Sequence, residues 1–154
     1  MLLSIIIIII TFVTMEGVAW ATHKYLMHGA LWFLHIDHHQ PKPHYRFQLN
    51  DLYFVIFAIP ALVLLYLGRE QWMTDIRFAI GVGITLYGMA YFLVHDVMIH
   101  GRFLWFKNVD STYFKAIRKA HHAHHRHRDK EDGESFGMLW APWKHFKSIE
   151  KSKS

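Results

Sequence analysis

Histidine is conspicuous in this chain of 154 residues, both in number and in spacing. Fourteen residues are histidine, and most of them fall into four short motifs. Two motifs have the spacing H-x-x-x-x-H and two have the spacing H-x-x-H-H, and the two kinds alternate along the chain. The histidines in these motifs are His23, His28, His35, His38, His39, His95, His100, His121, His124 and His125. Because imidazole is a common ligand of transition metals, the motifs predict a metal centre.

The two spacings place their imidazoles differently on a helix. Residues i, i+3 and i+4 share one helix face, so each triplet can direct three imidazoles to one point. Residues five apart lie about 140° apart on a straight α-helix, and they converge only where the helix ends or bulges. Ten imidazoles are too many for one ion, but two ions would take about five each and keep positions for water or oxygen. We therefore predict a two-metal centre.

The remaining residue types limit what else the centre contains. The chain has no cysteine, which excludes disulfides, iron–sulfur clusters and thiolate metal sites. The polar residues Asp37, Asp96 and Asn50 are candidates to orient the imidazoles by hydrogen bonds, although Asp37 and Asp96 could equally be ordinary surface carboxylates. The other histidines, which we assign to a solvated surface, are His44, His122, His127 and His145.

Hydrophobic residues make up 53% of the chain, yet its mean hydropathy is only +0.11, so apolar and polar stretches must be segregated. A helix needs about 20 apolar residues to cross a bilayer. Residues 2–22, 52–68 and 76–99 provide three such stretches. We predict an all-α integral membrane protein with a single domain over residues 1–154. The histidine-bearing segments 23–51 and 100–154 would then lie outside the bilayer.

Some residues within or beside the predicted spans call for an explanation. Gly81, Gly83 and Gly88 in the third span favour close approach of neighbouring helices. Asn50-Asp51 offers an N-cap for the second span. Glu16 lies in the first span on the same face as His23 and about 10 Å deeper. An intramembrane acid is commonly functional, but a hydrogen-bonded packing role is an equal alternative.

Three crossings bring all four histidine motifs to one side of the membrane. That side carries fifteen of the 17 lysine and arginine residues, and the opposite loop carries only Arg69 and Arg77. The positive-inside rule therefore predicts that the histidines face the cytoplasm and that the N-terminus lies outside. Orientation also accounts for the net charge of +5 without a nucleic-acid partner. Aromatic residues predicted to lie in the headgroup layer are Phe103, Trp105, Phe106, Phe136, Trp140, Trp143 and Phe146.

Three classes of protein fit a histidine-rich membrane chain. A bis-histidyl haem electron carrier would leave most of the ten histidines without a role. A metal transporter or buffer would have ionisable groups near mid-bilayer, where only Glu16 is present. An enzyme with two metal ions would use all ten histidines, and we favour it.

The residues around the motifs add a resemblance that covers nearly the whole chain. Residues 22–29 read Thr-His-Lys-Tyr-Leu-Met-His-Gly and residues 50–53 read Asn-Asp-Leu-Tyr. The other stretches are 35–39, 87–88, 91–92, 94–100, 120–125, 135–137 and 141–142. In this order they resemble the bacterial β-carotene hydroxylases of the fatty-acid hydroxylase superfamily.

The resemblance implies a non-haem di-iron centre with the ten histidines as ligands. It implies that O₂ and two externally supplied electrons are used to hydroxylate C3 of each β-ionone ring, which converts β-carotene to β-cryptoxanthin and then to zeaxanthin. The sequence has no flavin, nicotinamide or haem motif, so a ferredoxin-type partner is the expected electron donor. Zinc can replace iron at imidazole sites, so the isolated protein is expected to contain some zinc. Hydroxylation or desaturation of a fatty acid, sphingolipid or sterol stays open as an alternative substrate class.

The chain departs from the family pattern in two places. The loop between Pro41 and Asn50 is one residue longer than in relatives, which tend to have glutamate where Gln48 stands. We expect this loop to alter access to the centre or ring specificity. The second departure is the pair of additional histidines, His122 and His127.

Overall fold

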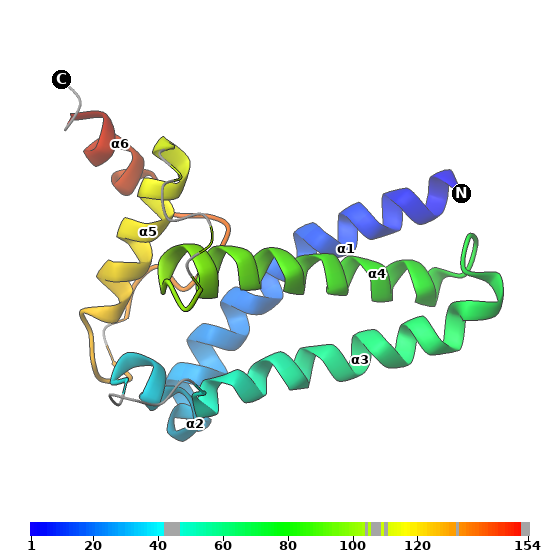
Figure 1. Cartoon of the computed structure of the whole chain (residues 1–154), viewed down its shortest axis with the longest axis horizontal. Helices are drawn as coiled ribbons and strands as arrows, with labels where there is room; N and C mark the ends of the chain where they lie inside the picture. Colours follow the sequence, from blue (N-terminus) through cyan, green and yellow to red (C-terminus); the bar gives the residue numbers. More distant parts are fainter. Residues whose placement is uncertain (42–46, 104, 106–108, 110, 132, 152–154) are drawn as a thin grey trace.

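The computed structural model describes residues 1–41, 47–103, 105, 109, 111–131 and 133–151 (Figure 1). The described residues are helical or lie in loops and turns, and none of them forms a strand. The α-helices are α1 (Leu2–Ala21), α2 (Trp32–His39), α3 (Leu52–Gly68), α4 (Ile76–Tyr91), α5 (Thr112–His125) and α6 (Trp143–Lys151). Two π-helical segments, η1 (Thr22–Ala30) and η4 (Phe92–Ile99), continue α1 and α4. Two 3₁₀ turns, η2 (Leu49–Asp51) and η3 (Arg69–Gln71), flank α3. The all-α prediction is confirmed.

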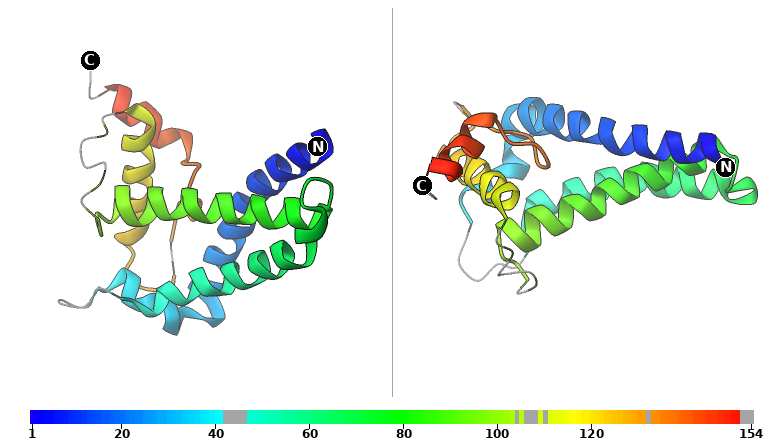
Figure 2. Two further views of the ribbon diagram at one scale, coloured as in Figure 1. Left: turned by 45° about the vertical axis from the view of Figure 1, so that its right-hand side comes forward. Right: turned by 90° about the horizontal axis from the view of Figure 1, so that it is seen from above.

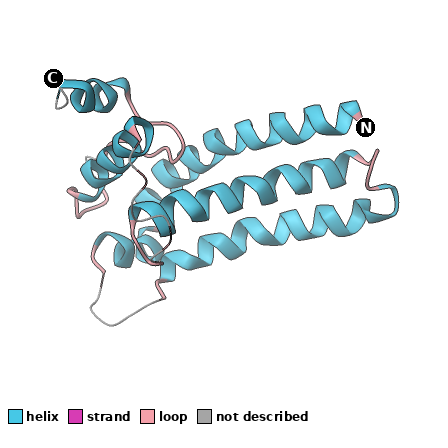
Figure 3. Cartoon of the chain, turned by 45° about the horizontal axis from the view of Figure 1, so that its top comes forward, coloured by secondary structure: helices cyan, strands magenta, loops and turns pink. Residues whose placement is uncertain are grey.

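Three helical stretches are long and apolar enough to cross a membrane, as predicted. They comprise Leu2–Ala30, Leu49–Gln71 and Ile76–Ile99, with 29, 23 and 24 residues. The first is longer than predicted because η1 extends α1 without a break. The three long helices run side by side, and α2, α5 and α6 gather at one end of them (Figure 3). The N-terminus and the turn between α3 and α4 lie at the other end (Figure 1).

Glycines in α4 allow two of its neighbours to come close. A Cβ atom on Gly81 would lie 3.0 Å from the Ala61 carbonyl oxygen of α3. A Cβ atom on Gly83 would lie 2.6 Å from Thr11 of α1. Close packing at these two glycines matches the prediction from the sequence. The prediction was wrong for Gly88, whose missing Cβ faces open space.

A small apolar core joins α5 to the end of the bundle. Val94 of η4 is buried against Ile117 and Ala120 of α5, and Met138 and Ala141 close the same cluster from the loop before α6. Burying these side chains stabilises the attachment of α5, because that helix has no place within the bundle itself. The helix with the second histidine triplet is thus held against the helix that ends with the second histidine pair.

Candidate metal centre

The π-helical segments bring histidines that are five residues apart onto the same side of their helix. A π-helix has hydrogen bonds from residue i+5 to residue i, so residues five apart come close to the same face. The N–H of His100 donates to the carbonyl oxygen of His95 at 2.9 Å, which is a bond of this type. The imidazole centroids are 4.5 Å apart in this pair and 5.2 Å apart in the His23–His28 pair. Both pairs therefore face inward together, which a straight α-helix would not allow.

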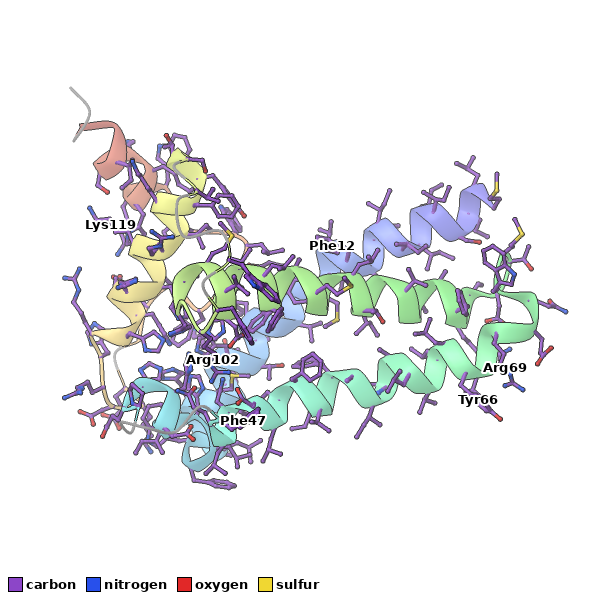
Figure 4. All side chains as sticks on the ribbon, in the orientation of Figure 1. Phe12, Phe47, Tyr66, Arg69, Arg102 and Lys119 are labelled. Atoms are coloured by element: carbon purple, nitrogen blue, oxygen red, sulfur yellow. The ribbon has the colours of Figure 1, made fainter. Side chains whose placement is uncertain are left out.

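The four motifs meet at one end of the bundle and form two groups of imidazoles. The described side chains there are rich in nitrogen around α2 and α5, and Arg102 lies beside them (Figure 4). The first histidine group consists of His23, His28, His35, His39 and His124. The second histidine group consists of His38, His95, His100 and His121. Within each group, one nitrogen from every ring lies within 4.8 Å of all the others.

The tenth predicted ligand, His125, lies between the two groups. Its ring centroid is 4.5 Å from that of His39 in the first group and 4.5 Å from that of His121 in the second. The Nε2 atom of His125 is buried and has no hydrogen-bond partner. The structure therefore brings all ten predicted ligands together. His125 is placed to complete the second group or to serve both.

The inward-facing Nε2 atoms of several rings approach one another closely. The Nε2–Nε2 distances are 3.1 Å for His23–His35, 3.1 Å for His28–His39 and 2.9 Å for His100–His121. Nitrogens bound to one ion at about 2.1 Å can be up to about 4.2 Å apart, so these separations suit shared coordination. The donor set fits a pair of divalent transition-metal ions.

In the first histidine group, backbone carbonyls hold most of the rings from behind. Nδ1–H donates from His23 to the Phe136 carbonyl at 3.0 Å and from His124 to the Glu134 carbonyl at 2.9 Å. His28 and His39 donate to the carbonyls of Lys130 and His127. Donation from Nδ1 fixes the tautomer in which Nε2 carries a lone pair, the form that binds a metal ion.

Side chains do the same work for His35 and for two rings of the second histidine group, His38 and His95. The Asn50 amide oxygen accepts from His35 Nδ1 at 2.6 Å, and the Gln48 amide oxygen accepts from His38 Nδ1 at 2.9 Å. Asp96 lies 3.3 Å from His95 Nδ1. Arg102 ties these acceptors together, because its guanidinium contacts Gln48, Asp96 and Asp51.

The three polar residues predicted to orient imidazoles have different places. Asn50 and Asp96 contact His35 and His95, as described above. The N-cap position of α3 is Asp51, whose side chain makes no capping hydrogen bond, and the Asn50 side chain is used by His35. Asp37 accepts instead from the backbone N–H of Leu49, and it fixes the loop after α2 rather than a ring.

Burial keeps the imidazoles neutral. It lowers the pKa of His39 to about 4 and that of His125 to about 3, and repulsion from neighbouring histidines adds to the effect. For His35 and His124, burial lowers the pKa to about 2. Only the neutral ring binds metal, so these four rings are in the ligand form at neutral pH.

The histidines outside the motifs do not all behave as predicted. The side chains of His122 and His127 are exposed, which agrees with a solvated surface. That assignment was wrong for His145, which is only 6% exposed, because it lies on α6 and this helix packs against α5. His44 lies outside the described residues, as do residues 42–46 of the loop that departs from the family pattern.

Phe136 contributes to the centre in a way that the sequence did not indicate. It was predicted to lie in the headgroup layer, but its ring packs 5.4 Å from His23, 5.2 Å from His28 and 5.1 Å from His124 between centroids. Its carbonyl also accepts from His23. Trp105, Trp140 and Trp143 are exposed, as residues of a membrane interface would be.

Comparisons with known proteins agree with this arrangement. A family model described as fatty acid hydroxylase matches residues 8–147. The chain is 41% identical to a β-carotene hydroxylase of Pantoea ananas, over 89% of this chain and 77% of the relative. It is 40% identical to a β-carotene hydroxylase of Pseudescherichia vulneris, over 92% and 78%, and 40% identical to a chloroplastic β-carotene 3-hydroxylase of Gentiana lutea, over 66% and 32%. No solved structure matches the chain.

Proposed function

Because the chain belongs to the fatty acid hydroxylase family, we propose that it is a membrane enzyme that hydroxylates the end rings of carotenoids. The observation that carries this proposal is the gathering of all ten predicted ligands at one end of three apolar helices, nine of them in two adjacent groups and His125 between the groups. The relatives named above, which are β-carotene hydroxylases, support carotenoids as the substrate class. We propose C3 of the β-ionone ring as the position of attack, first in β-carotene and then in β-cryptoxanthin.

Each histidine group would hold one iron ion, and His125 would complete the second set of ligands. Bound iron would supply the activation of O₂, with one oxygen atom inserted into the C–H bond and the other reduced to water by two electrons and two protons. The residues of the chain act around that chemistry. Nδ1 contacts hold seven of the ten rings in place, and burial of the imidazoles limits water at the centre.

The electrons must come from outside the chain, since the described residues provide no redox group besides the proposed metal centre. We propose a small acidic ferredoxin as the donor. Lysine and arginine residues predominate at the histidine end of the molecule, and opposite charges speed the encounter of two proteins. We also propose that this end faces the cytoplasm of a bacterial cell, with the N-terminus outside.

Pigment analysis under ¹⁸O₂ tests the proposal. The chain would be expressed in bacteria that accumulate β-carotene. The pigments would be separated, and their masses would be measured by mass spectrometry. We expect zeaxanthin with one ¹⁸O atom in each ring hydroxyl. Unchanged or unlabelled pigment from a well-expressed, iron-containing protein would refute carotenoid hydroxylation. Hydroxylated membrane lipid in the same cells would favour the fatty-acid or sterol alternative.

Two variants separate the metal centre from the rest of the fold. His38→Ala removes a buried ring of the second histidine group and should abolish zeaxanthin while the protein stays in the membrane. His122→Ala is the matched control, because His122 lies within the other histidine triplet in sequence but its side chain is exposed. Loss of product in both variants would mean that general damage, and not loss of a ligand, explains the effect.

A further inference from the structure

We propose that a groove between α1 and residues 135–142 binds the end ring of the carotenoid. This inference rests on the proposed function and names where its substrate lies. The segment 135–142, drawn in orange, reaches across to α1 (Figure 2). The groove between them has a volume of about 790 Å³. Pockets of about 300–1,000 Å³ hold compact organic molecules, so an end ring and the adjoining part of the polyene fit.

The groove is lined largely by apolar groups. Its walls include Phe12, Val13, Gly17, Trp20, Leu139 and Pro142. Figure 4 labels Phe12, which projects from α1. An apolar lining favours a hydrocarbon ring over a polar or charged ligand, because transfer of the apolar surface of the ring out of water is favourable.

The mouth of the groove faces the surface that lipid would cover. Val13 is 65% exposed and lies within the first candidate span, and Trp140 on the opposite wall is 77% exposed. Exposed apolar side chains on a membrane helix face hydrocarbon, so a molecule dissolved in the bilayer can reach the groove without crossing water. The long polyene can therefore stay in the bilayer while one end ring occupies the groove.

The inner wall of the groove adjoins the candidate metal centre. Phe136 lines the groove and its ring also packs against His23, His28 and His124 of the first histidine group. One aromatic side chain therefore separates the groove from the imidazoles. A ring that displaces or slides along Phe136 would bring a ring carbon next to the centre, as hydroxylation requires.

Glu16 explains how the segment 135–142 is held over α1. One carboxyl oxygen of Glu16 accepts from the backbone N–H groups of Met138, Leu139 and Trp140 at 2.8, 2.9 and 3.1 Å. The other accepts from the Tyr87 hydroxyl at 2.8 Å. Glu16 lines the groove as well, and because both of its carboxyl oxygens already accept hydrogen bonds, the intramembrane acid is an anchor for the roof of the groove.

Gly17 offers a way to fill the groove without disturbing the helix. A Cβ atom at Gly17 would meet no atom within 4 Å, so a larger side chain there would extend into the groove. Gly88 in α4 has the same open surroundings but is not part of the groove. Gly17→Leu and Gly88→Leu are thus a matched pair, because both introduce a good helix former at an unobstructed position.

Binding can be measured apart from catalysis. The iron-loaded full chain would be placed in phosphatidylcholine nanodiscs without an electron donor, so that no turnover occurs. β-Carotene is achiral, and its visible absorption band gains circular dichroism only when a chiral site twists it. We expect this signal with the wild-type chain and with Gly88→Leu, and we expect apparent affinity to fall about tenfold or more with Gly17→Leu, since overfilling a packed site is costly.

A second pair of variants keeps the result decisive if Gly17→Leu does not fold. Val13→Trp narrows the groove from its exposed wall, and Ile10→Trp adds the same bulk to another exposed position of α1 outside the groove. Equal iron content in all variants shows that the metal centre is intact. Loss of the signal in the two groove variants alone supports the inference.

Other outcomes would contradict the proposed binding of the end ring in the groove. An equal signal from Gly17→Leu and Gly88→Leu, or no signal from the wild-type chain, would place the carotenoid elsewhere. Lycopene has the same number of carbons as β-carotene but no closed ring. If lycopene gave as strong a signal, the groove would take any hydrocarbon chain, such as a lipid tail, and the assignment to an end ring would be wrong. Failure of the proposed function is distinct, because it appears as unchanged pigment in cells despite an intact β-carotene signal.

Discussion

Replacement of Glu16 with leucine should detach the loop before α6 from α1. The Glu16 carboxyl group is the shared acceptor for three consecutive backbone N–H groups and for the Tyr87 hydroxyl. Leucine has a similar volume but no acceptor, so these donors would be left facing apolar helix. Glutamine keeps an amide oxygen in the same place, and its NH₂ group can donate to the Tyr87 oxygen.

The size of the effect follows from the donors that lose their partner. Met138 is only 2% exposed, and Leu139 is half-buried. A buried donor without a partner costs about 1–3 kcal/mol, whereas the amide of exposed Trp140 can turn to other acceptors. We therefore expect Glu16→Leu to lower the free energy of unfolding by about 2–5 kcal/mol, and Glu16→Gln to lower it by about 1 kcal/mol.

The detached loop should also weaken metal binding. It includes the Phe136 carbonyl, which accepts from His23, and it follows directly on the Glu134 carbonyl, which accepts from His124. Loss of such a partner typically lowers metal affinity by about 10- to 100-fold. Glu16 is thus a positioning residue. Its effect on iron affinity should be rescued by glutamine and should be absent in Tyr87→Phe, which leaves the three amides bound.

Two measurements check this reasoning. Thermal unfolding in detergent gives the change in stability, and iron retention against chelators of graded strength gives the change in affinity. Iron held by Glu16→Leu as tightly as by the wild-type chain would refute the link between the anchor and the centre. Equal damage from leucine and glutamine would show that the carboxyl group has a role besides accepting hydrogen bonds.

Further predictions concern the support of the rings, the pH dependence and the metal. Gln48→Leu removes the acceptor for His38 and a partner of Arg102, so iron affinity should fall about 10- to 100-fold. Gln48→Glu should retain the iron affinity, and titration with ferrous iron compares the two variants. The metal-free chain should be most stable above pH 6.5 and lose stability as the pH falls toward 4. The reason is that burial lowers the pKa of His39 to about 4, so the unfolded chain takes up a proton at a higher pH than the folded chain does. Melting curves that coincide at pH 7 and pH 5 would contradict this. Protein from strong overexpression should contain zinc and lack hydroxylase activity, since imidazole sites do not prefer iron over zinc. Elemental analysis and pigment assays on the same preparation test this prediction. An active, fully zinc-loaded preparation would contradict it.

The three spans and the gathering of the histidines at one end could be predicted from the sequence for physical reasons. Apolar stretches of sufficient length have few alternatives in a membrane, and three crossings place all four motifs at the same end. The spacing of His23 and His28 also carried a signal, since five residues do not fit the period of an α-helix. In the structure, π-helical segments at both histidine pairs accommodate this spacing.

Groups that act through the backbone could not be predicted from the sequence in this way. The carbonyls of His127, Lys130 and Phe136 accept from ring nitrogens, but any residue type offers a carbonyl. Only the path of the chain decides which carbonyl reaches a ring. Asn50 had two predicted roles for a related reason, because an amide before a helix has the same appearance whether it caps the helix or contacts a histidine; the structure supports the contact with His35.

The two histidine groups are supported in different ways, and this links the groove to the centre. The first group depends on backbone carbonyls from residues 127–136, so its geometry follows the loop that continues into the roof of the groove. The second group depends on Gln48, Asp96 and Arg102, which belong to the ends of the spans. Movement of Phe136 when a ring enters the groove would therefore be felt by His23 and His124 and not by His38 and His95. The first group is accordingly the one placed to respond to substrate, while the second keeps its geometry.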